Sequence, residues 1–260
     1  MVIDARGYII YKDNRIIQKI IKHKRQLTTK EQKIIAYLLS KINPNEKYDK
    51  SKSYYICFDK REFCEICGID YNNGGNTNYI IDVLNSLSGH SFKMDTGKGI
   101  LGFQWISEPY IEHGMNQIEV QIPNRTYQYL VELKNFTKYE LYKILPLKST
   151  YSIALYEYIK SYSYKGNEII IDITDLKYYL GILNEETEKT GKTIYDDFKD
   201  FKKRVLNVAM DEINKYTDIT ISWQGIREGR YYKWIKFGIA DKDALQRYQA
   251  LKATKKALDG

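Results

Sequence analysis

The sequence contains few cysteines and no long apolar stretch, and both shortages exclude classes of protein. Three cysteines in 260 residues are an odd and sparse set, which does not suit a disulfide framework and does suit a reducing compartment. The longest unbroken apolar run, residues 34–39, is far shorter than the ~20 residues needed to cross a bilayer. Residues 1–11 lack the apolar core of a signal peptide. We therefore expect a cytoplasmic protein with free thiols and no membrane partner.

Metal-binding and enzyme motifs are also missing. Cys64 and Cys67 form a C-x-x-C pair without a second pair of ligands, so we interpret both as buried apolar residues on an amphipathic helix. The three histidines stand singly, which argues against a metal hydrolase and against a rolling-circle nickase. A phosphate-binding loop ending in Gly191-Lys192 would need a glycine where this sequence has Glu186. The sequence therefore predicts a protein that is not an enzyme and uses no cofactor or metal.

Positive charge and apolar surface are present in quantity. Hydrophobic residues make up 43% of the chain and charged residues 28%, which allows buried cores with a solvated surface. Lys and Arg number 41 against 33 Asp and Glu, so the net charge is +8 and the pI is about 9.0. An anionic polymer is a natural partner for such a surface. At roughly 150 residues per domain, the length predicts two compact domains.

The first half of the chain contains the element order of a winged helix-turn-helix. Thr28 and Glu31 form a capping box that begins the first helix. Asp59 can cap a later short helix, which Gly68 ends. In chain order we expect a helix, a strand, two helices and three strands that form the wing: residues 29–42, 54–58, 60–67, 77–87, 92–94, 100–106 and 118–122.

The second half repeats this order. Apolar residues at helical spacing predict a helix over residues 149–162, and a β-branched run predicts a strand over 168–173. Thr174 can cap a short helix, and a long third helix follows over residues 195–216. A hairpin with the tip 225–230 completes the unit as its wing.

The two halves align at an offset of 113 residues, which places Phe58-Asp59 over Ile171-Asp172. Such an internal match indicates two domains of one kind. We therefore expect an α+β fold with two tandem winged helix-turn-helix domains related by a pseudo-repeat, over residues 1–135 and 136–260.

The long third helix is the most informative element. At 100° per residue, one face of it is apolar and would pack on the core: Phe198, Phe201, Val205, Val208, Ala209 and Ile213. Its cations lie in the first half, where a helix in a major groove reaches bases and flanking phosphates. The alternative is an ordinary solvated face of a two-domain protein. The position of the helix, third in a winged unit, favours DNA recognition.

Several segments resemble one protein family. The stretch 195–206, the run Glu212-Ile213-Asn214-Lys215-Tyr216-Thr217-Asp218-Ile219 and Gly229-Arg230 resemble the C-terminal signature of iteron-plasmid replication initiators of the Rep_3 type. Residues 147–157 are similar to the helix that opens the second domain in that family, and residues 14–42 look like its N-terminal part. The resemblance covers most of the chain.

The resemblance implies two winged-helix domains and a function in replication. It implies binding to repeated sites in a plasmid origin, opening of the adjacent duplex, and recruitment of the host initiator ATPase and replicative helicase. It also implies homodimers, formed through the first domain, that bind an operator and repress the protein's own promoter, whereas monomers initiate. A winged-helix transcriptional repressor without an origin-firing role is the alternative, and an interaction scaffold is a third reading.

Candidate contacts with double-stranded DNA come from both domains. In the third helix of the second domain we expect cations on phosphates or guanine edges and an amide on adenine: Lys199, Lys202, Lys203, Arg204 and Asn207. At the wing tip, Arg227 and Arg230 would contact the backbone or the minor groove. In the first domain, Asn76, Asn78 and Asn85 would read a neighbouring groove.

Overall fold

The computed structural model describes residues 5–71, 76–191 and 194–259. The first half begins with elements that the sequence analysis did not predict, namely η1 (Ala5–Gly7), β1 (Ile9–Asp13), α1 (Asn14–Gln18) and β2 (Ile20–His23). The predicted order then follows, with β6 as one additional strand: α2 (Thr29–Ser40), β3 (Tyr54–Asp59), α3 (Lys60–Cys67), α4 (Asn76–Ser88), β4 (Ser91–Asp95), β5 (Ile100–Gln104), β6 (Ser107–Tyr110) and β7 (Gln117–Ile122).

The caps predicted for the first half are confirmed. The Thr28 hydroxyl accepts a hydrogen bond from the Glu31 backbone N–H, and the Glu31 carboxylate accepts one from Thr28 N at 2.9 Å. Asp59 accepts from Glu62 N at 2.8 Å, and Gly68 ends α3 in the left-handed conformation with φ of 65°. Local side-chain chemistry therefore sets the ends of these helices.

The predicted wing of the first half is wrong in one respect, because its three strands do not share a sheet. β4 pairs with β5 and with β2, whereas β7 pairs with β3 and β6 in a separate sheet. The predicted strand 100–106 ends at residue 104, and β6 follows as a strand that the sequence analysis did not predict. The wing is therefore the β4–β5 hairpin alone.

The second half carries the same order with a longer wing. Its elements are α5 (Asn124–Val131), β8 (Phe136–Glu140), η2 (Leu141–Lys143), α6 (Thr150–Tyr162), η3 (Ser163–Lys165), β9 (Glu168–Asp172), α7 (Ile173–Tyr179), α8 (Glu185–Thr190), α9 (Phe198–Phe201), the π-helical η4 (Lys202–Leu206), α10 (Asn207–Tyr216), β10 (Ile219–Glu228), β11 (Tyr231–Asp241) and α11 (Ala244–Asp259). Asp172, not the predicted Thr174, caps α7, because its carboxylate accepts from Thr174 N at 2.7 Å.

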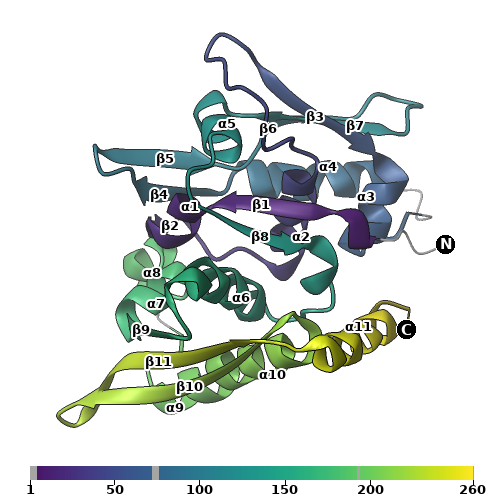
Figure 1. Ribbon diagram of the computed structural model, residues 1–260. Helices are drawn as coiled ribbons and strands as arrows, with labels where there is room; N and C mark the ends of the chain where they lie inside the picture. Colours follow the sequence, from purple (N-terminus) through teal and green to yellow (C-terminus); the bar gives the residue numbers. More distant parts are fainter. Residues whose placement is uncertain (1–4, 72–75, 192–193, 260) are drawn as a thin grey trace.

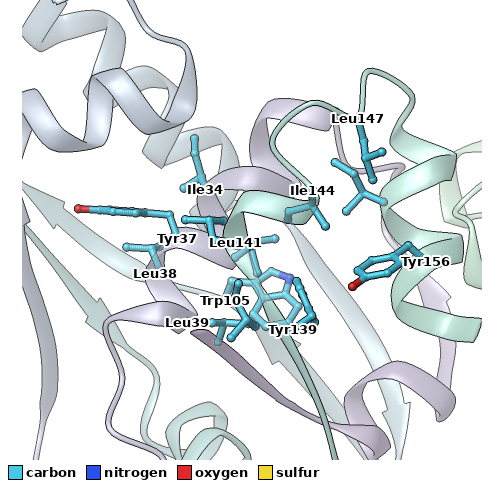
Figure 2. Close-up of a cluster of buried hydrophobic side chains, with 14 of the residues drawn as sticks. Ile34, Tyr37, Leu38, Leu39, Trp105, Tyr139, Leu141, Ile144, Leu147 and Tyr156 are labelled. Carbon is cyan, nitrogen blue, oxygen red and sulfur yellow. The ribbon is translucent and has the colours of Figure 1, made fainter. Parts of the chain in front are cut away.

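The two halves share an extensive buried boundary. β1 pairs antiparallel with β8, and Figure 2 shows side chains of α2, of the segment 139–147 and of α6 in one apolar cluster. Lys12 on β1 forms an ion pair with Glu157 on α6 at 2.6 Å, with both side chains at least 90% buried, and Tyr139 on β8 donates to the same carboxylate. The predicted boundary at residue 135 lies just before β8, and this division of the chain stays a prediction.

The second unit lies below the first in Figure 1, and the β10–β11 hairpin projects at the lower left, beside α9 and α10.

Cys64 and Cys67 are buried on α3, as predicted. Among the residues that the structure describes, no helix has the length and apolar character needed to cross a membrane.

Candidate nucleic-acid interface

The third helix of the second unit begins three residues later than predicted and contains a π-helical turn. Asp197 caps it by accepting from Lys199 N at 2.9 Å. From Lys202 to Leu206 the backbone is π-helical, which adds a residue to the turn and shifts every later side chain relative to an α-helix. Because of that shift, Val205 and Leu206 are both fully buried, and the predicted core residue Val208 is only half-buried.

The predicted cations of this helix lie on its solvent face. Lys199, Lys202, Lys203 and Arg204 are all exposed, and Asn207 is half-buried. The Arg204 guanidinium lies 3.9 Å from the Asp200 carboxylate, where both side chains are more than half exposed, so this pair is weak and breaks easily. The helix therefore offers a cluster of positive charge that an anion can approach.

A groove separates this helix from the wing. It encloses about 1250 Å³ and is bounded by α9 and α10 on one side and by the β10–β11 hairpin on the other. Lys199, Lys202, Asn207 and Arg230 line it, whereas Lys203 and Arg204 lie outside its lining. Asp196 and Asp197 border the same groove, so its charge is mixed where α9 begins.

Two aromatic side chains of the wing that the sequence analysis did not single out, Tyr232 and Trp223, pack against the helix. The Tyr232 ring stacks on Phe198, with centroids 4.0 Å apart and planes inclined by 19°. The Lys202 ammonium lies 5.6 Å from the centroid of Trp223. The concentration of aromatic residues on β11, at positions 231, 232, 234 and 237, together with Trp223 on β10, was the signal that could have located this contact.

The two arginines of the wing, Arg227 and Arg230, differ in how firmly their side chains are held. Arg230 lies in the turn with Gly229, whose φ of 63° suits a tight hairpin, and its side chain is exposed. Arg227 lies beside a β-bulge, donates to the Tyr232 hydroxyl at 3.0 Å and stacks on that ring at 4.5 Å. Arg230 is thus presented freely at the tip, and Arg227 is fixed in place.

Gly225 makes this arrangement possible. A Cβ atom at this position would lie 2.7 Å from the Tyr232 ring and 3.2 Å from the Phe198 ring. Only glycine lets the two rings close over the strand.

The most specific part of the family resemblance, residues 212–219, turns out to be structural. Asn214 donates to Ile221 O at 2.9 Å and accepts from Ile221 N at 2.6 Å, so it pairs with the backbone of β10 as another strand would. The Glu212 carboxylate accepts from the backbone N–H of Ser149 at 3.1 Å, just before α6.

Asp218, in the same run, is also engaged inside the protein. It accepts from Lys160 Nζ at 2.6 Å and from the Tyr156 hydroxyl at 2.8 Å. Burial raises the pKa of Asp218, but Lys160 and these hydrogen bonds outweigh burial and lower it below its usual value. The run therefore joins α10 to α6 and to the wing.

In the first unit, the corresponding helix α4 presents amides but no cations. Asn78, Asp82 and Asn85 are exposed at spacings of four and three residues and share one face. Asn76 is the first residue of α4, but its side chain lies outside the described part of the structure. No Lys or Arg occurs between residues 76 and 88, and Asp82 adds a negative charge in the middle of the face.

Lysines from neighbouring elements surround α4 instead. Lys30 donates to the Tyr79 hydroxyl at 2.6 Å, Lys60 to the Thr77 hydroxyl at 2.8 Å, and Lys24 to Gly89 O at 3.1 Å. Of these three lysines, Lys60 was not singled out from the sequence, because it belongs to α3 and not to the helix that carries the amides. Which side chains contact DNA stays a prediction for both units.

Comparison with known proteins places this architecture in a family. Residues 9–160 match the family described as "Initiator Replication protein, WH1", and residues 172–239 match "Initiator Rep protein, WH2". A replication initiation protein of Escherichia coli is 22% identical over 202 residues, which are 75% of this chain and 60% of the relative. The PI protein of Escherichia coli is 33% identical over 167 residues, which are 62% of this chain and 50% of the relative.

The chain thus spans between half and three-fifths of the length of these curated relatives. A solved structure of the Pi initiator protein in complex with iteron DNA superimposes with a TM-score of 0.68. The match covers 92% of this chain and 99% of that chain at 20% identity, so the two share a fold.

Proposed function

This chain belongs to the initiator replication protein family, which it matches in both winged-helix units, and from that membership we propose that it binds repeated sites in a plasmid origin and initiates replication there. The observation that carries the proposal is the cluster of exposed cations on η4 and the turn before it, beside an arginine-tipped wing. Iteron DNA is the ligand named for the solved Pi initiator, and we extend it to this chain. The protein acts by binding DNA, without covalent chemistry of its own.

The second unit makes the main sequence-specific contacts in this proposal. Its third helix enters a major groove, where four cations contact phosphates or guanine edges and an amide contacts adenine: Lys199, Lys202, Lys203, Arg204 and Asn207. Arg230 reaches the adjacent backbone, and Arg227 contributes the N–H groups that Tyr232 leaves free. A cation on a phosphate releases counterions, so these contacts make the affinity depend on salt.

The first unit reads a neighbouring groove about one helical turn away (~10.5 base pairs) through Asn76, Asn78 and Asn85. Exposure of Asn78 and Asn85 on one face of α4 supports this assignment.

Family resemblance also supports proposals about partners. We propose that monomers bind the origin repeats and recruit the host initiator ATPase and replicative helicase, whereas homodimers formed through the first domain bind an operator and repress transcription. We place these events in the cytoplasm. The division into residues 1–135 and 136–260 is likewise our proposal, and the fragments released by limited proteolysis test it.

The decisive test of DNA recognition is a titration of the purified protein against a duplex that carries the repeats of its own plasmid and against a scrambled duplex. We expect a preference of ~10³ or more for the repeats at physiological salt. Equal, weak and steeply salt-dependent binding to both duplexes would reduce the interface to a non-specific basic surface.

Lys203→Ala tests the recognition helix within that experiment. We expect weaker binding and a plot of log K against log salt that is shallower by about 0.9, the value for one phosphate contact. Lys165→Ala removes an exposed cation outside the groove and serves as the charge-matched control. An unchanged affinity and slope for Lys203→Ala would remove this residue from the interface.

An assay in cells separates an initiator from a repressor with the same fold. A plasmid that carries only the origin should replicate when this protein is supplied from a second replicon, and should be lost without it. If the protein represses its promoter but does not maintain the origin plasmid, the repressor alternative is correct.

A further inference from the structure

A second basic groove lies on the first unit, and none of the described residues that line it belongs to α4. It encloses about 710 Å³ between the β4–β5 hairpin, the start of α5 and the loop that precedes β3, and Figure 1 shows α5 beside β5. Three exposed cations line it, one from each segment: Lys98, Arg125 and Lys50. Within the described residues, no carboxylate lines the groove and none of these three cations forms an ion pair.

Carboxylates near the groove in sequence are already satisfied by their own loops. Asp49 accepts from the backbone N–H of Ser51 at 2.9 Å and from its hydroxyl at 2.7 Å, and these bonds lower the pKa of Asp49. Asp95 accepts from Gly97 N at 2.8 Å. These acids shape the turns and leave the cations of the groove uncompensated.

The segments that carry the cations are held in place. The Asn124 amide donates to Lys50 O at 3.2 Å and to Lys52 O at 2.7 Å, while its oxygen accepts from the Tyr48 hydroxyl. At the hairpin tip, the Thr96 hydroxyl donates to Gly99 O at 2.8 Å. An anion that binds here therefore meets a preorganised set of charges, which reduces the entropy lost on binding.

We propose that this groove binds the sugar-phosphate backbone of duplex DNA, as a second contact of the first unit that is independent of base sequence. The proposal rests on the proposed function, because the same DNA must lie on the second unit. Three cations from three segments suit successive phosphates, and the Gln128 amide, which donates one N–H to Glu132, has a second N–H to offer. Ile100, which is 69% exposed at the rim, can contact a deoxyribose.

This groove resolves a difficulty of α4, whose exposed face has amides and Asp82 but no cation. A helix face without Lys or Arg contributes little electrostatic attraction to a polyanion. The cations of the groove beside the wing would supply that attraction. The two roles then divide within the first unit, with amides for bases and the groove for the backbone.

The test uses the full chain with Lys50, Lys98 and Arg125 all replaced by Ala, bound to a repeat-containing duplex with at least one extra helical turn on each side. We expect affinity at 0.1 M salt to fall by roughly tenfold or more and the salt slope to decrease by up to about 2.7, the value for three phosphate contacts. The ratio of affinities for repeat and scrambled duplexes should stay unchanged. A control with the same loss of charge outside the groove replaces Lys134, Lys138 and Lys165.

Two other outcomes separate this proposal from the proposed function. If Lys203→Ala weakens binding but the triple groove variant matches wild type in affinity and slope, the groove does not bind DNA and the initiator assignment stands. If wild type binds repeat and scrambled duplexes alike, the proposed function fails. The groove is then judged on the scrambled duplex, where an unchanged slope for the triple variant would overturn it.

Discussion

Tyr232 on the β10–β11 wing stacks on Phe198, the first residue of α9, with the ring centroids 4.0 Å apart. The same phenol accepts a hydrogen bond from Arg227 through its hydroxyl at 3.0 Å. One side chain thus fixes the angle between the wing and the helix and also the position of an arginine in the wing. In the DNA complex that we propose, both elements contact the same duplex at once, so their relative placement matters for affinity.

Replacing Tyr232 should therefore weaken DNA binding without unfolding the protein. An aromatic pair is worth about 0.5–1.5 kcal/mol, so Tyr232→Leu should raise the dissociation constant for repeat DNA roughly two- to tenfold. Tyr232→Phe keeps the stacked ring and loses only the bond to Arg227, so its effect should be smaller. Fluorescence anisotropy titrations compare the variants, and equal affinities for all three proteins would show that the stack does not position the wing.

Gly225→Ala should destabilise the second unit by about 1–3 kcal/mol, because its Cβ would lie 2.7 Å from the Tyr232 ring. Thermal unfolding followed by circular dichroism measures the effect. Gly102→Ala, in β5, is the matched control, since nothing lies within 4 Å of its Cβ position. An equal change in melting temperature for both variants would contradict the steric argument.

Breaking the buried ion pair between Lys12 and Glu157 should strongly destabilise the boundary between the halves. Glu157→Ala leaves a buried ammonium without its partner, and such losses cost about 3–5 kcal/mol. Changing both residues to apolar ones, Lys12→Met with Glu157→Leu, should cost far less, because no charge is left unpaired. Urea unfolding of the three proteins provides the comparison, and a double variant as unstable as Glu157→Ala would argue against this explanation.

His23 should make the fold less stable in mild acid. Burial, reinforced by repulsion from His90, lowers the pKa of His23 from 6.5 to about 3, and its Nε2–H donates to Tyr179 O at 3.2 Å. Between these two pH values the unfolded chain binds a proton that the folded protein does not, so stability falls as pH falls through this window.

The variant His23→Gln removes this proton-binding group. The difference in urea midpoint between pH 7 and pH 4.5 should be smaller in the variant than in wild type. A difference of the same size in both proteins would show that other groups cause the acid sensitivity.

Sequence periodicity predicted the elements whose ends are set by local chemistry. The Thr28 capping box and the left-handed Gly68 need only neighbouring residues, and both were placed correctly. The β1–β8 sheet was missed, because its two strands are more than 120 residues apart and neither alternates clearly. Helix-wheel reasoning assumes 100° per residue and so could not foresee the π-helical turn at residues 202–206.

The candidate site was predicted in the same uneven way. A helical-wheel projection of the third helix predicts which of its cations are exposed, and Lys199 and Lys203 are exposed as that projection predicted. The roles of Glu212 and Asn214 could not be read from the sequence, because their partners are backbone groups of other segments. A polar residue looks the same in a sequence whether it faces DNA or caps a distant helix.

The pairing of β1 with β8 has a consequence for the newly made chain. Partners in this sheet run from Asp13 with Phe136 to Ile9 with Glu140, so β1 emerges from the ribosome with no strand to join until more than 120 further residues are translated. At about 5–20 residues per second, that delay is roughly 6 to 26 s. During this interval the backbone N–H and C=O groups of β1 lack their partner strand and can pair with other polypeptides. The cell's holding chaperones therefore have a natural substrate in the nascent first unit.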